Sequence, residues 1–229
     1  MTSQPVFSAP VICLSPFGRP DARLVAAAAQ AGATGVLDLG TDRRWARAAL
    51  EQLAAWTSGP IGVRLGAGAV LDAGEIARVG AGRVDLVVLA EPAAPGTWPA
   101  EVRVLVEVTD RAEARHAAAA GAYGLIARGN EAGGRVGALS TFVLLQQLLD
   151  DPLLSLPVWA AGGIGVHTAP AAVLGGAAGV VLDTALALLP ESDLPGDLAA
   201  WLRRLDGSES AVEDGMRGVR SLDGTAQLQ

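Results

Sequence analysis

The sequence predicts an α/β protein, a compact (β/α)8 TIM barrel, on three observations. Eight short apolar runs recur along the first 190 residues, and nearly every one is followed by a stretch with helical spacing. The runs do not alternate between polar and apolar residues, which is typical of parallel strands covered on both faces. A tight glycine turn leading into a buried strand recurs at residues 32–38, 121–127 and 176–182, as expected of a repeated unit. Eight such units without a ninth strand favour a closed barrel.

Each element follows from local signals. The expected strands span residues 11–15, 34–40, 61–65, 86–90, 102–108, 124–127, 158–161 and 179–184. The expected helices span residues 23–31, 72–79, 111–120, 140–149, 167–174 and 197–205, with another beginning at 41–42. Asp21 and Asp110 are expected helix caps, and Trp45, Ala49, Leu50 and Leu53 are expected on one face of the helix that begins at 41–42.

The chain is expected to divide into a barrel over residues 1–190 and a C-terminal extension over 191–229. The extension should contain a helix and then a polar, glycine-dotted tail or linker from Asp206 onward. Such a tail cannot bury enough apolar surface to offset its ordering entropy. We expect it to be mobile or to contact the barrel through only a few residues, such as Val212 and Met216.

Composition excludes several classes of function. The net charge of −7 and the pI near 4.8 argue against nucleic acid or an anionic membrane as a partner. The sequence contains 17 arginines and no lysine, so Schiff-base chemistry and a P-loop lysine are excluded. Cys13 is the single cysteine, and no histidine–carboxylate cluster suggests a metal. No signal-peptide pattern or membrane-length apolar run is present, so a cytoplasmic location is expected.

Two glycine-rich loops follow consecutive strands. Residues 124–127 lead into a loop carrying Glu131, Gly133 and Gly134, and residues 158–161 lead into Gly162 and Gly163. Such loops present backbone N–H groups at the carboxyl ends of strands, where α/β barrels bind phosphates. Thr184 at the end of the eighth strand would supply the third side of such a site. The carboxylate of Asp183 would repel a phosphate unless it points away.

Charged and polar residues gather at the expected carboxyl ends of the strands. They are Ser15, Asp38, Arg64, Glu91, Glu107, Arg128, Asn130, Glu131 and Asp183. Buried charges must be paired or bound to a ligand. They therefore indicate either a ligand site or a structural ring of ion pairs that closes the barrel mouth.

Three segments give this barrel a specific resemblance. Residues 127–137 (Ala-Arg-Gly-Asn-Glu-Ala-Gly-Gly-Arg-Val-Gly), 160–165 (Ala-Ala-Gly-Gly-Ile-Gly) and 176–184 (Gly-Ala-Ala-Gly-Val-Val-Leu-Asp-Thr) resemble the nitronate monooxygenase (2-nitropropane dioxygenase-like) family. That family consists of FMN-binding (β/α)8 barrels related to flavin-dependent enoyl reductases. The resemblance is strongest to the variety embedded in bacterial polyketide synthases.

The resemblance implies roles for individual residues. Expected cofactor-binding residues are Leu14, Ser15, Gly133, Gly134, Gly162, Gly163 and Thr184, and expected catalytic residues are Arg64, Glu107, Arg128 and Arg135. Arg135 stands where the family has its catalytic histidine, and Asp183 where it has a glycine. Because arginine is no general base near neutral pH, nitronate oxidation by the family's route is not expected.

The sequence therefore predicts an FMN-type oxidoreductase-like barrel that serves polyketide assembly and binds FMN weakly or is isolated without it. Its expected partners are an acyl or polyketide substrate or other polyketide synthase domains. One alternative is an inactive scaffold or docking domain of a polyketide synthase. Another is a flavin-free phosphosugar-type isomerase or lyase that uses Glu107 and Asp38 as acid and base.

Overall fold

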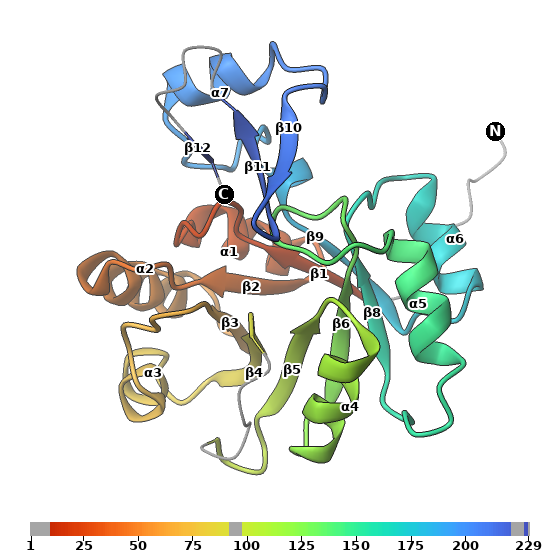
Figure 1. The fold of residues 1–229 in the computed structure, drawn as a ribbon. Coiled ribbons are helices and arrows are strands. Elements are labelled where there is room, and N and C mark those ends of the chain that lie inside the picture. The colour runs from red at the N-terminus through yellow and green to blue at the C-terminus, as the bar shows by residue number, and fades with distance from the viewer. Residues whose placement is uncertain (1–9, 92–97, 221–226, 229) are drawn as a thin grey trace, which may run out of the picture.

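A computed structural model of the chain describes residues 10–91, 98–220 and 227–228. Eight parallel strands close into a barrel in the order β1-β2-β3-β4-β5-β6-β8-β9, with β9 paired to β1 (Figure 1). The barrel strands are β1 (Val11–Leu14), β2 (Thr34–Asp38), β3 (Ile61–Leu65), β4 (Val84–Leu89), β5 (Arg103–Val108), β6 (Gly124–Arg128), β8 (Val158–Ala161) and β9 (Gly179–Leu182). The predicted fold class is confirmed.

Helices surround the barrel as the sequence predicted. They are α1 (Ala22–Gln30), α2 (Arg43–Trp56), α3 (Ala73–Val79), α4 (Arg111–Ala119), α5 (Thr141–Leu149), α6 (Thr168–Leu174) and α7 (Gly196–Leu202), with a 3-10 turn at η1 (Thr184–Leu186). Asp21 and Asp110 cap α1 and α4 by accepting backbone N–H groups of the first turns. Among the described residues, no helix has the length and hydrophobicity needed to cross a membrane.

Trp45 does not share the buried face of α2 with Ala49, Leu50 and Leu53. The buried stripe of α2 is Ala46, Ala49, Leu50 and Leu53, which follows the three- and four-residue spacing of a helix face. Trp45 lies one position before this stripe and is 56% exposed. Its ring stacks with the guanidinium of Arg19, whose central carbon lies 5.0 Å from the ring centroid.

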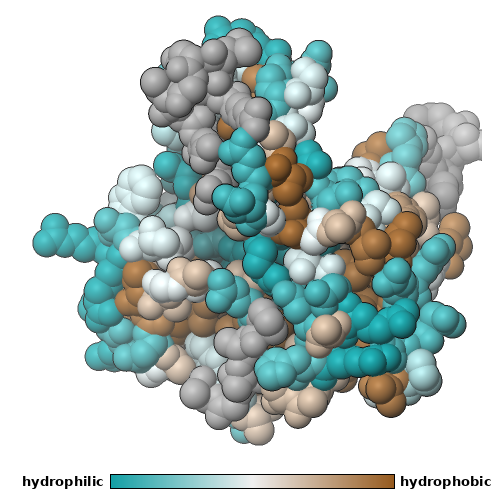
Figure 2. Space-filling view, viewed as in Figure 1, coloured by the Kyte–Doolittle hydropathy of each residue, from teal (hydrophilic) through white to brown (hydrophobic). Residues whose placement is uncertain are grey.

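The surface over the outer helices is mostly hydrophilic, with scattered apolar patches (Figure 2). Exposed apolar side chains include Val143 and Leu149 on α5 and Leu174 on α6. Single exposed apolar residues are common on soluble proteins and need no partner to explain them.

The barrel interior is filled by alternate residues of its strands. Ile12, Leu14, Val36, Leu86, Val88, Leu105, Ile126, Ala161 and Val181 form one inward cluster, while the outward residues pack against the helices. Because side chains of a strand alternate with a period of two, the residues two positions further along also point inward. These are Asp38 after Val36, Glu107 after Leu105 and Arg128 after Ile126. The top layer of the barrel is therefore charged.

The C-terminal tail forms a hairpin, which the sequence analysis did not predict. Strands β10 (Ser210–Glu213) and β11 (Met216–Arg220) pair antiparallel, and a short strand β12 (Gln227–Leu228) pairs with β11. Asp214 and Gly215 join β10 to β11 with φ of 49° and 75°. An Asp-Gly pair with two positive φ angles is the preferred two-residue hairpin turn.

The hairpin lies over the carboxyl ends of the barrel strands (Figure 1). Its strand β11 pairs with β7 (Gly134–Arg135), a short strand within the first glycine-rich loop. Val136 also donates its N–H to the carbonyl of Gly215 at 2.8 Å. Residues 221–226 and 229 of the predicted tail lie outside the described residues, and the boundary near residue 190 stays a prediction.

Candidate functional site at the barrel mouth

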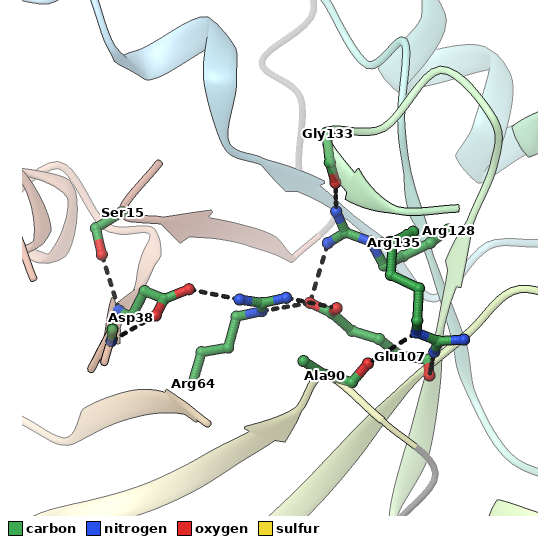
Figure 3. A network of polar contacts seen from close by, with 9 residues as sticks. Ser15, Asp38, Arg64, Ala90, Glu107, Arg128, Gly133 and Arg135 are labelled. Carbon is green, nitrogen blue, oxygen red and sulfur yellow. Dashed lines mark hydrogen bonds and ion pairs between the residues drawn. The ribbon is translucent and has the colours of Figure 1, made fainter. Parts of the chain in front are cut away.

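Two arginines and two carboxylates form a connected network across the charged top layer (Figure 3). Arg64 on β3 donates to both carboxylate oxygens of Glu107, from Nε at 2.8 Å and from Nη2 at 2.9 Å. Its Nη1 lies 2.5 Å from Oδ2 of Asp38. Arg128 on β6 donates to the same Glu107 carboxylate at 3.0 Å. The two positive and two negative charges therefore balance within the network.

The network fixes the protonation state of Glu107. Burial alone would raise the pKa of Glu107, but Arg128 and Arg64 outweigh it and hold the pKa at about 2. Burial likewise disfavours the charge of Arg64, yet the carboxylates of Glu107 and Asp38 raise its pKa above the ordinary value. Glu107 therefore remains an anion near neutral pH, and its negative charge is shared between two guanidinium groups.

Asp38 is fixed by a second set of contacts on β1 and β2. Its backbone N–H donates to Oγ of Ser15 at 2.8 Å, and its Oδ1 accepts the N–H of Gly40 at 2.8 Å. Both Ser15 and Asp38 are buried. The carboxylate that balances Arg64 is thus held by the Gly40 N–H, while Ser15 holds the backbone of Asp38.

Arg135 has a different environment from the other two arginines. It lies on β7, and Nη1 lies 2.6 Å from Oε1 of Glu113. Its other nitrogens donate to the carbonyls of Glu107 at 3.0 Å and Ala90 at 3.3 Å. These contacts fasten the glycine-rich loop to β5 and to the end of β4. Arg135 is not among the residues that line the cavity described next.

A cavity of about 350 Å³ opens at the carboxyl ends of the strands. Of the residues expected to form a site, those that line it are Leu14, Ser15, Arg64, Arg128, Gly133, Gly134 and Thr184. The expected site residues Glu107, Arg135, Gly162 and Gly163 are not among its lining residues. Glu107 lies beneath the cavity and reaches it only through the guanidinium groups it holds.

The second glycine pair packs against the first glycine-rich loop. A Cβ at Gly162 would lie 2.8 Å from the backbone nitrogen of Ala132, and one at Gly163 would lie 3.5 Å from Cβ of Glu131. Both glycines have positive φ, at 108° and 63°. The close approach of the two loops therefore requires glycine at position 162, and the positive φ favours glycine at position 163, whether or not a ligand binds.

Glu131 serves a local structural purpose. Its Oε2 accepts both the backbone N–H and the hydroxyl of Thr141 at 2.9 Å, so the carboxylate lies at the first turn of α5. The N-cap residue Ser140 makes no side-chain bond to this helix. Glu131 thus accepts the Thr141 N–H at the start of the helix, for which Ser140 provides no side-chain acceptor.

Asp183 accepts a hydrogen bond from the backbone N–H of Thr184 at the end of β9, where the sequence predicted a phosphate-binding residue. Its Oδ1 accepts the backbone N–H of Thr184 at 2.6 Å and lies 3.3 Å from the Thr184 hydroxyl. Thr184 faces the glycine loop, because a Cβ at Gly133 would lie 3.5 Å from its Cγ2. Thr184 therefore lies beside the first glycine-rich loop with a carboxylate next to it, and its role in a phosphate site stays a prediction.

The roof of the cavity comes from the C-terminal extension. The lining residues that sequence reasoning missed include Leu202, Leu205, Gly207, Ser210, Arg217, Gly218 and Val219. The Asp-Gly turn between two short strand-forming runs was the signal that could have located the hairpin. Its placement over the barrel depends on pairing between β11 and β7, which local sequence does not encode. Among the described residues, no group of three histidine, cysteine or acidic side chains is arranged to hold a metal ion.

Comparisons with known proteins agree with this geometry. The nitronate monooxygenase family model matches residues 97–199. A hydroxy-methyl-oxo-octahydroindene-carboxyl-CoA dehydrogenase of Mycobacterium tuberculosis is 36% identical over 183 residues, which are 76% of this chain and 51% of that protein. A Rhodococcus jostii protein of the same name is 36% identical over 121 residues, 51% of this chain and 34% of that protein. The chain thus spans about half the length, or less, of the curated relatives it matches.

Solved structures share the barrel. FabK from Thermotoga maritima has a TM-score of 0.80 and 26% identity, covering 94% of this chain and 72% of that one. Nitroalkane oxidase from Streptomyces ansochromogenes has a TM-score of 0.75 and 24% identity, covering 92% and 77%. The enoyl reductase domain of MlnA, from the macrolactin biosynthesis cluster of Bacillus amyloliquefaciens, has a TM-score of 0.70 and 15% identity, covering 91% and 63%. The last two show the fold alone.

The family-model match over residues 97–199 and the barrel shared with FabK lead to one conclusion: the chain is similar to the nitronate monooxygenase-like TIM barrels.

Proposed function

We propose that the chain is an FMN-type oxidoreductase barrel that acts on an enoyl or related acyl group in polyketide assembly. The observation that carries this proposal is the cavity at the carboxyl ends of the strands. Its wall is made by Leu14, Ser15, Gly133, Gly134 and Thr184, the residues that the family resemblance assigns to the flavin. TIM-barrel enzymes place their reacting groups at this end of the barrel.

The cavity suits the two ends of FMN unequally. A volume of about 350 Å³ lies near the lower end of ligand-binding pockets, and an apolar wall at Leu14 beside bare glycine backbone suits a planar ring. At the other end, the Thr184 N–H is already bonded to Asp183. A phosphate can use that donor only if Asp183 turns away. We therefore expect FMN to bind, but weakly. When bound, FMN supplies hydride transfer from a nicotinamide.

The chain's own residues favour electrostatic stabilisation over proton transfer. Arginine does not give up its proton near neutral pH, and Glu107 with a pKa of about 2 is a very weak base. Arg64 and Arg128 line the cavity, and each has N–H groups beyond those that hold Glu107. They would hold negative charge that develops on a substrate carbonyl oxygen. Arg135, at the position of the family's histidine, would position the glycine loop.

One observation supports an acyl substrate. The curated relatives carry the name of a carboxyl-CoA dehydrogenase, so their named substrate is an acyl thioester. The polyketide association itself rests on the resemblance of residues 127–137 and 160–165 to barrels embedded in polyketide synthases.

A scaffold or docking domain of a polyketide synthase is the second candidate. The observation that favours it is the neutral network of Asp38, Arg64, Glu107 and Arg128, in which every charge is balanced from within the protein. The isomerase or lyase alternative has less support, because both of its proposed acid–base carboxylates are bound to Arg64 and Glu107 is held ionised.

One titration separates these candidates. The purified protein is titrated with FMN, and visible absorbance and flavin fluorescence are recorded, with a flavin-free protein of similar size as the control. Saturable binding, followed by NADH or NADPH oxidation that depends on an enoyl thioester, supports the oxidoreductase. Saturable binding without turnover on any acyl thioester restricts the proposal to a flavin-binding barrel. No binding at millimolar FMN contradicts the proposal and favours the scaffold.

A further inference from the structure

The roof of the cavity carries a cation that the barrel itself does not supply. Arg217 on β11 lines the cavity, and β11 holds it directly opposite Gly134 in the β7 pairing. Its Nε donates to the carbonyl of Asn130, and its Nη1 donates to Oγ of Ser210 at 2.7 Å. Both acceptors are neutral, so these bonds orient the guanidinium without cancelling its charge.

The charge of Arg217 is not balanced within the part of the chain that the structure describes. Its contacts there include no carboxylate, whereas Arg64 and Arg128 share Glu107 and Asp38. A guanidinium has five N–H groups, and Nη2 of Arg217 donates to no described acceptor. It is also not among the described buried nitrogens that lack a partner.

Arg217 and Thr184 flank the glycine-rich loop from two sides. Gly134 pairs with Arg217, while Gly133 approaches the Thr184 side chain. A fixed guanidinium, a hydroxyl and bare backbone around one space make an arrangement that binds phosphoryl groups, because the guanidinium can offer two parallel N–H bonds to phosphate oxygens. The carboxylates of Glu131 and Asp183 also line this space, and each is bonded to backbone N–H groups. They weaken such binding, but neither of them forms an ion pair with Arg217 in the part of the chain that the structure describes.

The geometry points to Arg217 as a phosphoryl-binding residue of the cavity, supplied by the C-terminal hairpin. This inference rests on the proposed function for the identity of the ligand. The phosphoryl group belongs either to FMN or to the phosphopantetheine arm of an acyl thioester. In both cases the hairpin is part of the binding site.

Paired ligands that differ only in the phosphoryl group test this assignment. The full chain, Arg217→Gln, Arg217→Lys and the matched control Arg204→Gln are titrated with FMN and riboflavin, and with phosphopantetheine and pantetheine. Arg204 is exposed, follows α7 and does not line the cavity. We expect the preference for the phosphorylated member of one pair to fall roughly 10- to 100-fold in Arg217→Gln. It should fall less in Arg217→Lys and remain unchanged in Arg204→Gln.

The two pairs distinguish the two sources and separate this inference from the proposed function. A loss confined to the FMN–riboflavin pair assigns Arg217 to the flavin phosphate. A loss confined to the phosphopantetheine pair assigns it to the acyl carrier arm, even if the protein binds no flavin and the flavin proposal fails. If Arg217→Gln melts at a lower temperature than the parent protein, the test rests on Arg217→Lys, in which a partial loss of the preference for the phosphorylated ligand supports the assignment. Equal preferences in Arg217→Gln and Arg204→Gln, or no phosphoryl preference in the parent protein, overturn the assignment.

Discussion

Replacing Asp183 by glycine should strengthen FMN binding. The carboxylate accepts the Thr184 N–H at 2.6 Å at the end of β9, and the Thr184 side chain faces the glycine loop. A phosphate oxygen that took this N–H would lie about 3 Å from the same nitrogen. The two anions would then lie within about 4 Å of each other. Asp183→Gly removes the competing acceptor and the repulsion together.

The size of the gain follows from Coulomb's law and exposure. Two like unit charges about 4 Å apart repel by about 4 kcal/mol at an effective dielectric of about 20. Asp183 is half-buried and Thr184 is exposed, so solvent screens the pair. A screened repulsion of about 1–2 kcal/mol corresponds to a decrease of roughly 5- to 30-fold in Kd for FMN.

Fluorescence quenching of FMN measures this change. Asp183→Asn is included because it removes the charge but keeps an acceptor for the Thr184 N–H, and we expect it to give a smaller gain. Asp150→Asn is the matched control, since Asp150 is an exposed carboxylate at the far end of α5. Riboflavin, which has no phosphate, should bind all four proteins equally. An unchanged FMN affinity in Asp183→Gly would refute the placement of a phosphate at Thr184.

Three further predictions concern the network and the hairpin. Glu107→Gln should lower the free energy of unfolding by about 3–5 kcal/mol in urea denaturation, because Arg64 and Arg128 lose a buried counter-charge. The control Glu51→Gln changes an exposed carboxylate and should lower the free energy of unfolding by less than about 1 kcal/mol. Equal losses in the two variants would contradict the stabilising role of the network. Because folding lowers the pKa of Glu107 from 4.5 to about 2, its stabilising contribution is complete above the unfolded value and is lost as pH falls from 4.5 towards 2. Unfolding measured in this range should therefore show a shallower loss of stability in Glu107→Gln than in the parent, and parallel curves would refute it. Deleting residues 206–229 should change the melting temperature little, because no described residue from 206 to 219 is buried. The same deletion should weaken ligand binding. A large drop in melting temperature would show that the tail belongs to the core.

Most of the barrel was predictable because its signals are local. Each strand is an apolar run that ends at a turn, and each expected cap such as Asp21 lies immediately before its helix. The inward direction of Asp38, Glu107 and Arg128 also follows from strand periodicity alone. The charged residues at the strand ends could therefore be identified without a structure.

The partners of those residues could not be identified in the same way. Sequence indicates that Glu107 and Arg128 face inward, but not that Arg64 reaches across the barrel to hold both oxygens of Glu107. Arg135 follows the paired glycines and was expected in the site, yet the β7 pairing aims its guanidinium at Glu113. Such outcomes depend on contacts between segments far apart in the chain, which residue types and spacing do not specify.

The pairing of β7 with β11 has a consequence for how the protein is made. A ribosome delivers the chain from its N-terminus, and the barrel has all its strands once β9 has emerged to pair with β1. The loop that carries Gly134 precedes β9 in the chain, whereas its pairing partner β11 follows β9 and emerges later. Only when β11 emerges can the hairpin close over the mouth. During synthesis there is therefore an interval in which all eight barrel strands have emerged and the cavity is open, and the emergence of β11 ends that interval.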